Sequence, residues 1–233
     1  MKKCFFVVVG VLLFSMIISG CASQKAWVYK PNTYRQPSVF SEKTVVVPPF
    51  IDQRDDINKN RILLYLIPLM PFGWADYNAP EGAQMHINSG IWINYKPTED
   101  FAKALAQELK NANVFKEAYF DFKKGSSDII ITGKIINTKY SGNLISYGLS
   151  VYGPLLWLVG FPAGSINNEL SIELSCTDSK TNQLLFSKTY LAPKYSKISW
   201  IYNLPNDFNY SSMLNGLYKQ FVLDLKNEPT VFK

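Results

Sequence analysis

The amino-acid sequence predicts an α+β protein, in which a central mixed sheet of about five strands and two amphipathic helices form a two-layer α/β arrangement. Residues 44–47 form an uninterrupted β-branched run, which is typical of a strand buried on both faces. Residues 98–112 and 210–226 repeat apolar side chains at helical spacing. Residues 168–177 and 184–190 flank a short polar turn, which favours a β-hairpin.

The first helix is expected over residues 98–112. Thr98 can cap its N-terminus, and Glu99 and Asp100 favour the positive end of the helix dipole. Asn113 can close the helix, because asparagine tolerates the left-handed conformation found after helix C-termini.

The remaining strands are expected in residues 43–50 before this helix and in residues 114–122 and 128–137 after it. In residues 168–177 the apolar side chains alternate and share one face with Cys176. Cys176 is therefore expected to be a buried structural thiol.

The N-terminal segment has the layout of a secretory signal peptide. Lys2 and Lys3 precede an apolar run over residues 4–18, which is shorter than the about 20 residues of a transmembrane helix. The following segment, Ile18-Ser19-Gly20-Cys21, resembles the lipobox of bacterial lipoproteins. The alternatives are an ordinary signal peptide with an incidental cysteine, or a retained membrane anchor.

This resemblance implies that residues 1–20 are removed and that Cys21 carries a diacylglycerol group and an N-acyl chain, with no other cofactor. Ala22 rather than aspartate resembles an outer-membrane sorting signal, so the protein is expected at the periplasmic face of the outer membrane. Residues 21–41 are polar and lack periodicity, which indicates a lipidated tether. One periplasmic domain is expected over residues 42–228.

Composition narrows the possible partners. Without residues 1–20 the chain has 22 basic and 18 acidic residues and a net charge of +4. The basic residues are scattered, so nucleic acid is not an expected partner. With Cys21 acylated, Cys176 is the one remaining thiol and no intramolecular disulfide can form.

Two long apolar insertions, residues 61–75 and 140–168, interrupt the domain. Proline and glycine break both, so neither predicts a transmembrane helix. Three interpretations stay open: the insertions pack internally as a second small core, form an exposed surface that docks a partner or a second copy, or dip into the membrane interface.

Part of the chain resembles periplasmic α/β lipoprotein domains of the LpoB type and of the N-terminal CsgG type. Residues 45–50, Asp52, Arg54, the helix ending near residues 114–115, and residues 128–133 carry the resemblance. It implies a binding or assembly module rather than an enzyme.

Patterns of catalytic chemistry are missing from the sequence. No glycine-rich phosphate loop and no cysteine or histidine cluster with zinc spacing occurs, and His86 is the one histidine. The acidic group of Asp52, Asp55 and Asp56 does not fit a calcium loop. We therefore expect no catalytic residues and no metal.

The sequence thus predicts a lipid-anchored periplasmic binding or assembly module of the bacterial cell envelope. Its expected partners are membrane lipid, through Cys21, and another envelope protein; a homo-oligomer is also compatible. The alternatives are an envelope hydrolase with unrecognised carboxylates, or an oligomeric secretion or pore subunit. The expected partner-binding residues are Asp52, Arg54, Leu66, Met70, Phe72, Trp74, Tyr147, Tyr152, Trp157 and Phe161.

Overall fold

The computed structural model describes residues 25–35, 40–82, 92–93, 95–123, 125–201 and 209–232. The signal segment, Cys21 and His86 lie outside these residues. Within them, every helix is too short or too polar to cross a membrane.

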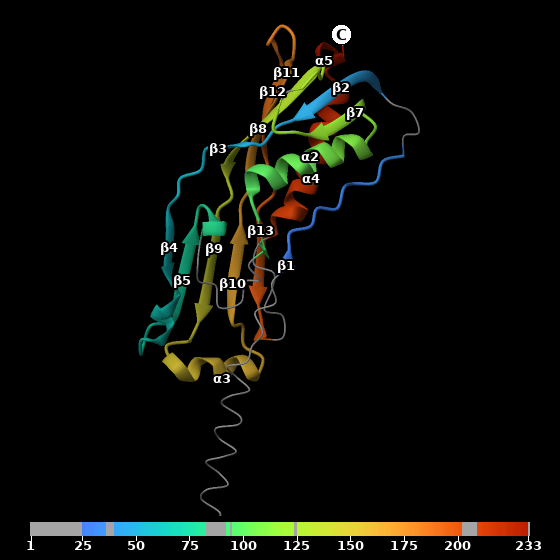
Figure 1. Cartoon of the computed structure of the whole chain (residues 1–233). Coiled ribbons are helices and arrows are strands. Elements are labelled where there is room, and N and C mark those ends of the chain that lie inside the picture. Colours follow the sequence, from blue (N-terminus) through green and yellow to red (C-terminus); the bar gives the residue numbers. More distant parts are fainter. Residues whose placement is uncertain are drawn as a thin grey trace, which may run out of the picture.

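A six-stranded mixed sheet forms one half of the molecule (Figure 1). Five of its strands have the order β12-β11-β8-β2-β7, and the short strand β3 also pairs with β8. β2 is parallel to β7 and β8, whereas β11 is antiparallel to β8 and β12, which confirms the predicted hairpin. The bounds are β2 Ser41–Val47, β3 Ile51–Asp52, β7 Phe115–Phe120, β8 Ile129–Asn137, β11 Ser171–Asp178 and β12 Leu184–Leu191.

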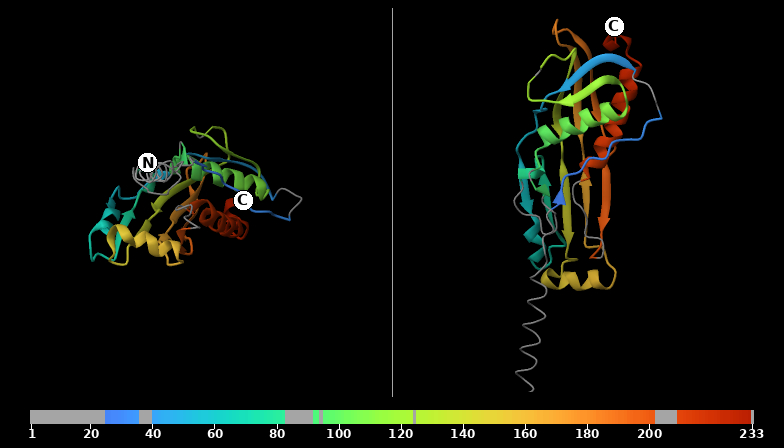
Figure 2. Two further views of the ribbon diagram at one scale, coloured as in Figure 1. Left: turned by 90° about the horizontal axis from the view of Figure 1, so that it is seen from below. Right: turned by 45° about the vertical axis from the view of Figure 1, so that its right-hand side comes forward.

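Two helices cover one face of this sheet, as Figure 2 shows from two further directions. They are α2, Pro97–Asn111, and α4, Tyr210–Lys226; a short helix α5, Pro229–Phe232, follows. The predicted apolar stripes face inward, and Phe101 and Phe221 have no exposed surface. The two-layer arrangement is thus confirmed for this half.

The start of α2 differs from the prediction. Lys96, not Thr98, is the N-cap residue, and it makes no side-chain capping bond. Pro97 occupies the first helical position, where its missing N–H leaves no donor unpaired. Asn113 follows the helix with a φ of 48°, as its residue type predicts.

A second, antiparallel sheet of five strands extends the first, so the prediction of one sheet is only roughly right. Its order is β13-β10-β9-β5-β4. Strands β9, β10 and β13 lie close in sequence to β8, β11 and β12, so three long strands run from one sheet into the other (Figure 1). The bounds are β4 Asn58–Arg61, β5 Phe72–Tyr77, β9 Tyr140–Ile145, β10 Gly164–Asn168 and β13 Tyr195–Ser199.

Short elements complete the chain. A two-stranded parallel sheet joins β1, Lys25–Ala26, to β6, Trp92–Ile93. Three 3-10 helices and one short α-helix occupy the connections: η1 Ile62–Leu66, η2 Pro80–Gly82, η3 Ser150–Tyr152 and α3 Gly153–Leu158.

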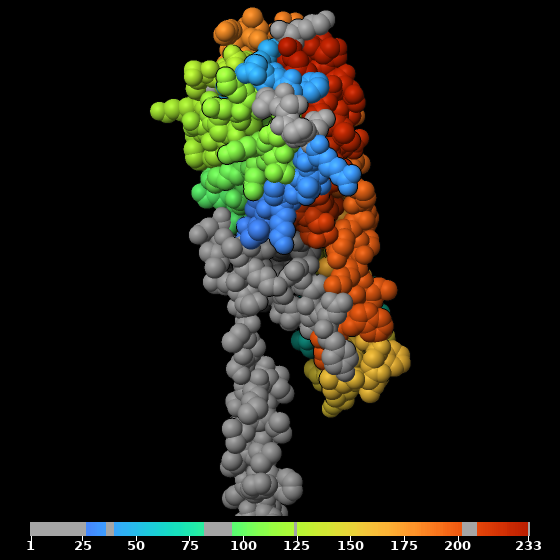
Figure 3. All heavy atoms as spheres, turned by 90° about the vertical axis from the view of Figure 1, so that its right-hand side faces the viewer, coloured from blue at the N-terminus to red at the C-terminus, as the bar shows by residue number. Residues whose placement is uncertain are grey.

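Part of the expected tether, residues 21–41, packs on the domain, so the free part of the tether is shorter than predicted. Tyr29 is buried, and its hydroxyl donates a hydrogen bond to Glu108 of α2 over 2.7 Å. Asn215 of α4 donates its side-chain amide to the Lys30 carbonyl over 2.8 Å. In Figure 3 this segment, in blue, lies across α2 in green and α4 in red. The aromatic and amide side chains of residues 27–34 thus dock the expected tether on the domain.

Candidate functional site

The two apolar insertions come together at the far end of the second sheet. We call this end the apolar tip: residues 62–73, 144–164 and 199–201. Figure 1 shows it at the bottom, around α3. None of its residues carries a charge. Exposed side chains cover it, with exposed fractions of 88% for Leu69, 71% for Val159 and 68% for Tyr152. The interpretation as an internal second core is therefore wrong for these side chains.

Glycine allows the tip to fold tightly. At Gly73 a Cβ atom would lie 1.8 Å from the carbonyl oxygen of Ile62, because η1 crosses over β5 there. Leu69, Tyr147 and Ser150 have positive φ angles of 69°, 59° and 54°. Non-glycine residues adopt this region only where the surrounding structure holds them, and such residues gather at functional sites.

Hydrogen bonds between the two insertions hold these conformations. Leu69 donates its backbone N–H to the Gly148 carbonyl over 3.0 Å. The Ser146 hydroxyl donates to the Met70 carbonyl over 2.7 Å, and the Ser150 hydroxyl donates to the Leu66 carbonyl. Hydrogen bonds thus join the two insertions into one tip, although the insertions lie far apart in sequence.

Eight of the ten expected partner-binding residues lie at or beside the tip. Three are partly buried: Trp157 donates its indole N–H to the Ile145 carbonyl over 2.9 Å, and Tyr147 donates its hydroxyl to the Pro162 carbonyl over 2.7 Å. The third, Trp74, lies under the Arg61 guanidinium at 5.9 Å. The five exposed ones are Leu66, Met70, Phe72, Tyr152 and Phe161.

Other exposed apolar side chains at the tip escaped the sequence prediction. Leu69, Leu155 and Val159 lie inside the insertions, but an apolar run does not reveal which of its members face outward. Outside the insertions, Trp200 follows β13 inside the tip, and Ile198 lies on β13 just beside it. The antiparallel pairing of β13 with β10 brings them to the same end of the sheet.

Basic residues are the first charges that follow the tip. Arg61 on β4 pairs with Trp74 of β5, and Lys197 on β13 pairs with Ile166 of β10. These two strands are the opposite edges of the second sheet. The described tip therefore has an uncharged end with one cation on each side.

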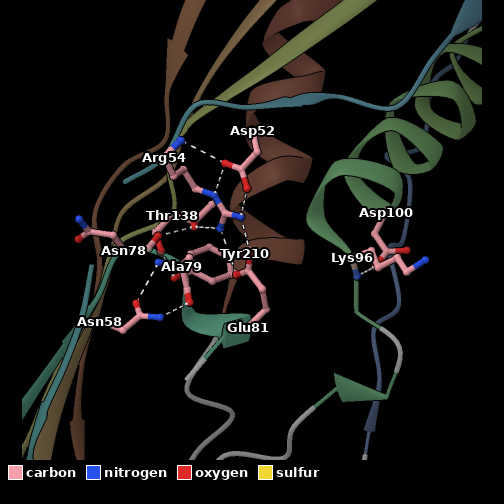
Figure 4. A network of polar contacts seen from close by, with 10 residues as sticks. All are labelled: Asp52, Arg54, Asn58, Asn78, Ala79, Glu81, Lys96, Asp100, Thr138 and Tyr210. Atoms are coloured by element: carbon pink, nitrogen blue, oxygen red, sulfur yellow. Dashed lines mark hydrogen bonds and ion pairs between the residues drawn. The ribbon is translucent and has the colours of Figure 1, made fainter. Parts of the chain in front are cut away.

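Asp52 and Arg54, the other two expected partner-binding residues, lie elsewhere. Figure 4 shows Arg54 where the two sheets meet, between Asp52, Thr138 and Glu81. Its guanidinium donates to the Asp52 carboxylate over 2.7 and 2.8 Å and to the Thr138 hydroxyl over 2.6 Å, and it also pairs with Glu81. Thr138 lies six residues before the tip begins at Leu144, or about 20 Å along an extended strand.

Electrostatics indicate a structural role for this junction. The hydrogen bond from Arg54 lowers the pKa of Asp52 below its ordinary value, despite partial burial. Burial opposes the charge on Arg54, yet its hydrogen bonds to Asp52 and Glu81 raise its pKa. Arg54 links Asp52 on β3 to Thr138 between β8 and β9 and to Glu81 on η2, which follows β5. Because its side chain is only 2% exposed, it presents little surface to a partner.

Other candidate chemistry is limited. In the described ranges, no group of three or more histidine, cysteine or acidic residues is placed to hold a metal ion. Cys176 is a free thiol with no exposed surface, which confirms its predicted burial. Burial raises its pKa and so keeps it protonated.

Comparisons with known proteins give only distant similarities. No family model matches the chain, and no curated protein matches its sequence. Similar solved structures include a Xanthomonas campestris protein of family DUF330, with a TM-score of 0.43 and 10% identity over 88% of this chain and 96% of that one.

Two further structures are less similar. A dodecamer of a PelC variant from Paraburkholderia phytofirmans has a TM-score of 0.38 and 8% identity over 85% of this chain and 96% of that one. A homolog of the neuraminyllactose-binding hemagglutinin from Helicobacter pylori has a TM-score of 0.35 and 9% identity over 88% and 91% of the two chains. Function therefore has to be derived from the residues of this chain.

Proposed function

We propose that this protein is a lipid-anchored, non-enzymatic docking module of the bacterial cell envelope. Cys21 carries the lipid on the periplasmic face of the outer membrane, and the apolar tip is the docking surface. The observation that carries the proposal is the charge-free, exposed tip. Large exposed apolar patches on soluble domains mark sites that contact a partner or a membrane.

The geometry of the tip supports docking rather than loose exposed loops. Its two insertions are joined by backbone and side-chain hydrogen bonds, including that from Leu69 to Gly148 over 3.0 Å. A surface that is already held by hydrogen bonds loses little conformational entropy when it binds. More of the free energy gained by burying its apolar side chains therefore contributes to affinity.

The lipid anchor is tested by substitution of its acceptor. Cys21→Ala should abolish incorporation of labelled palmitate and leave the precursor uncleaved. Cys176→Ala is the matched control, because a buried thiol does not take up lipid. Palmitate incorporation that survives Cys21→Ala would contradict the assignment.

Docking is tested by crosslinking in cells. A photo-activatable amino acid at Leu69 or Tyr152 should form adducts with a component of the envelope. The same probe at Lys180, in the turn between β11 and β12 at the other end, should form few. Equal adduct yields from the two ends would contradict the assignment of the tip as the docking surface.

A further inference from the structure

The tip differs from a protein-binding surface in its polar groups. Protein interfaces carry about one hydrogen bond per 100–200 Å² and a polar rim. In the tip, the hydroxyls of Ser146, Tyr147 and Ser150 and the indole N–H of Trp157 donate to backbone carbonyls of the tip itself. These groups are already paired and are not offered to a partner.

Backbone groups of the tip are paired in the same way. The amides of Tyr152, Val159 and Phe161 donate to carbonyls three to five residues earlier, over 3.0 to 3.2 Å. Ile145 donates to the Ala163 carbonyl over 2.8 Å, and Ala163 donates to Ser199 over 2.7 Å. An irregular backbone enters an apolar phase only when its amides are satisfied internally. The tip meets this condition at these positions.

The types of side chain change along the strands, from the end of the tip toward the middle of the molecule. The most exposed residues of the tip are the aliphatic Leu69 and Val159, followed by the aromatic Tyr152. Trp74 and Trp200 lie nearer the charged rows, and Arg61 and Lys197 follow as the first cations. A mainly aliphatic end, then tryptophans and then basic residues are the order in which side chains meet acyl chains, the headgroup boundary and anionic phosphates.

The position of the lipid anchor in the sequence also places the membrane on the side of the molecule where the tip lies. The described chain starts at β1, which lies on the tip side of α2 and α4 in Figures 1 and 2. Cys21 is four residues before Lys25, so it lies within about 14 Å of it. The segment after β1 is held on the helices by Glu108 and cannot lengthen this reach. A lipid on Cys21 therefore places the bilayer near the tip and away from the β11–β12 turn.

We infer that the apolar tip inserts into the interface of the bilayer that holds the Cys21 lipid. Leu69, Tyr152, Leu155 and Val159 enter the boundary between headgroups and acyl chains, and Arg61 and Lys197 lie at the level of the phosphates. The inference rests on the proposed lipid anchor and names the occupant of the proposed docking surface. The anchor and the tip then fix the orientation of the domain on the membrane.

Fluorescent probes in lipid vesicles test the inference. The acylated full chain, labelled with an environment-sensitive fluorophore at Leu69→Cys or Tyr152→Cys, is reconstituted into vesicles of phosphatidylethanolamine and phosphatidylglycerol. We expect a blue shift and a loss of emission when lipids carry a quencher near the headgroup. Leu184→Cys, exposed at the opposite end, is the control and should show neither change.

Placing a charged side chain in the tip distinguishes insertion of the tip into the bilayer from nonspecific contact of the protein with vesicles. With the probe at Val159→Cys, the change Leu155→Asp should return the emission to that of the probe in water, while Leu184→Asp should leave it blue-shifted. Circular dichroism of the variants verifies that they fold.

Two results would overturn the inference. Tip probes that match the Leu184 probe on vesicles would show that the tip remains in water. A blue shift without quenching by lipid would show that a second copy covers the tip. In either case, a protein adduct from the tip in cells would leave the docking function standing, whereas equal adducts from both ends would remove that function as well.

Discussion

Glu108 is a carboxylate without exposed surface in the middle of α2. It accepts hydrogen bonds from the hydroxyls of Tyr29 and Tyr34 over 2.7 and 2.5 Å, and from both the backbone and the side chain of Asn32. A buried carboxylate is tolerated only when its oxygens are bonded in this way. In the sequence, Glu108 is a polar residue on an apolar helical face. Its partners lie 74 to 79 residues earlier, so the sequence of α2 could not predict them.

Glu108→Ala should lower the free energy of unfolding by about 3 kcal/mol, because it leaves buried donors unpaired. It should also release residues 27–34 from the helices, which limited proteolysis would detect as faster cleavage near Tyr29. Gln107→Ala, an exposed neighbour in the same helix, is the matched control. Unchanged cleavage in Glu108→Ala would contradict the role of Glu108 in docking this segment.

The Asp52–Arg54 pair should make stability depend on pH. The pKa of Asp52 is lowered from 3.8 in the folded protein. Its contribution is therefore fully present above about pH 4, which is its unfolded pKa, and is lost as pH falls through the lower folded value. The stability difference between the wild type and Asp52→Asn should shrink below pH 4.

Urea unfolding between pH 6 and pH 2.5 measures this difference, with Asp55→Asn in the exposed loop after β3 as control. A difference that stays constant over this range would contradict the assigned pairing.

The helices and the first sheet follow local rules, and their elements were predictable. The bounds of α4 agree with the apolar repeat over residues 210–226, and β8 and β11 agree with the β-branched and alternating runs. The second sheet was not predictable in this way. Its strands β5 and β9 contain Gly73, Gly142 and Asn143, residue types that weaken strands. Strand β9 forms as the continuation of β8, and β5 is held by its pairing with β9 and β4.

Packing of η1 on β5 provides a test of this second sheet. Gly73→Ala should destabilise the protein by about 1–3 kcal/mol, because its Cβ would overlap the Ile62 carbonyl oxygen and push η1 away. Gly216→Ala in α4 is the matched control: no atom lies within 4 Å of its Cβ, and alanine should stabilise the helix by up to about 1 kcal/mol. Denaturant unfolding measures both changes; equal effects would contradict the crossing of η1 over Gly73.

At the scale of the whole molecule, the sequence could reveal that the insertions were apolar but not that they meet at one end. That arrangement depends on the pairing of β5 with β9 and of β9 with β10, contacts between residues far apart in the chain. The same pairing separates the tip from Asp52 and Arg54, which the sequence placed on one surface with it. The long shared strands convert two unrelated apolar segments into one end of an elongated molecule (Figure 1).

The orientation of this elongated molecule on a membrane shows whether the tip inserts into the bilayer. Neutron reflectometry of the acylated protein on a supported bilayer resolves the protein density along the membrane normal. We predict that the narrow tip lies within the headgroup layer and that the helix-covered sheet forms the outer density. A molecule lying flat on the bilayer, or one with the β11–β12 turn nearest to it, would contradict insertion of the tip.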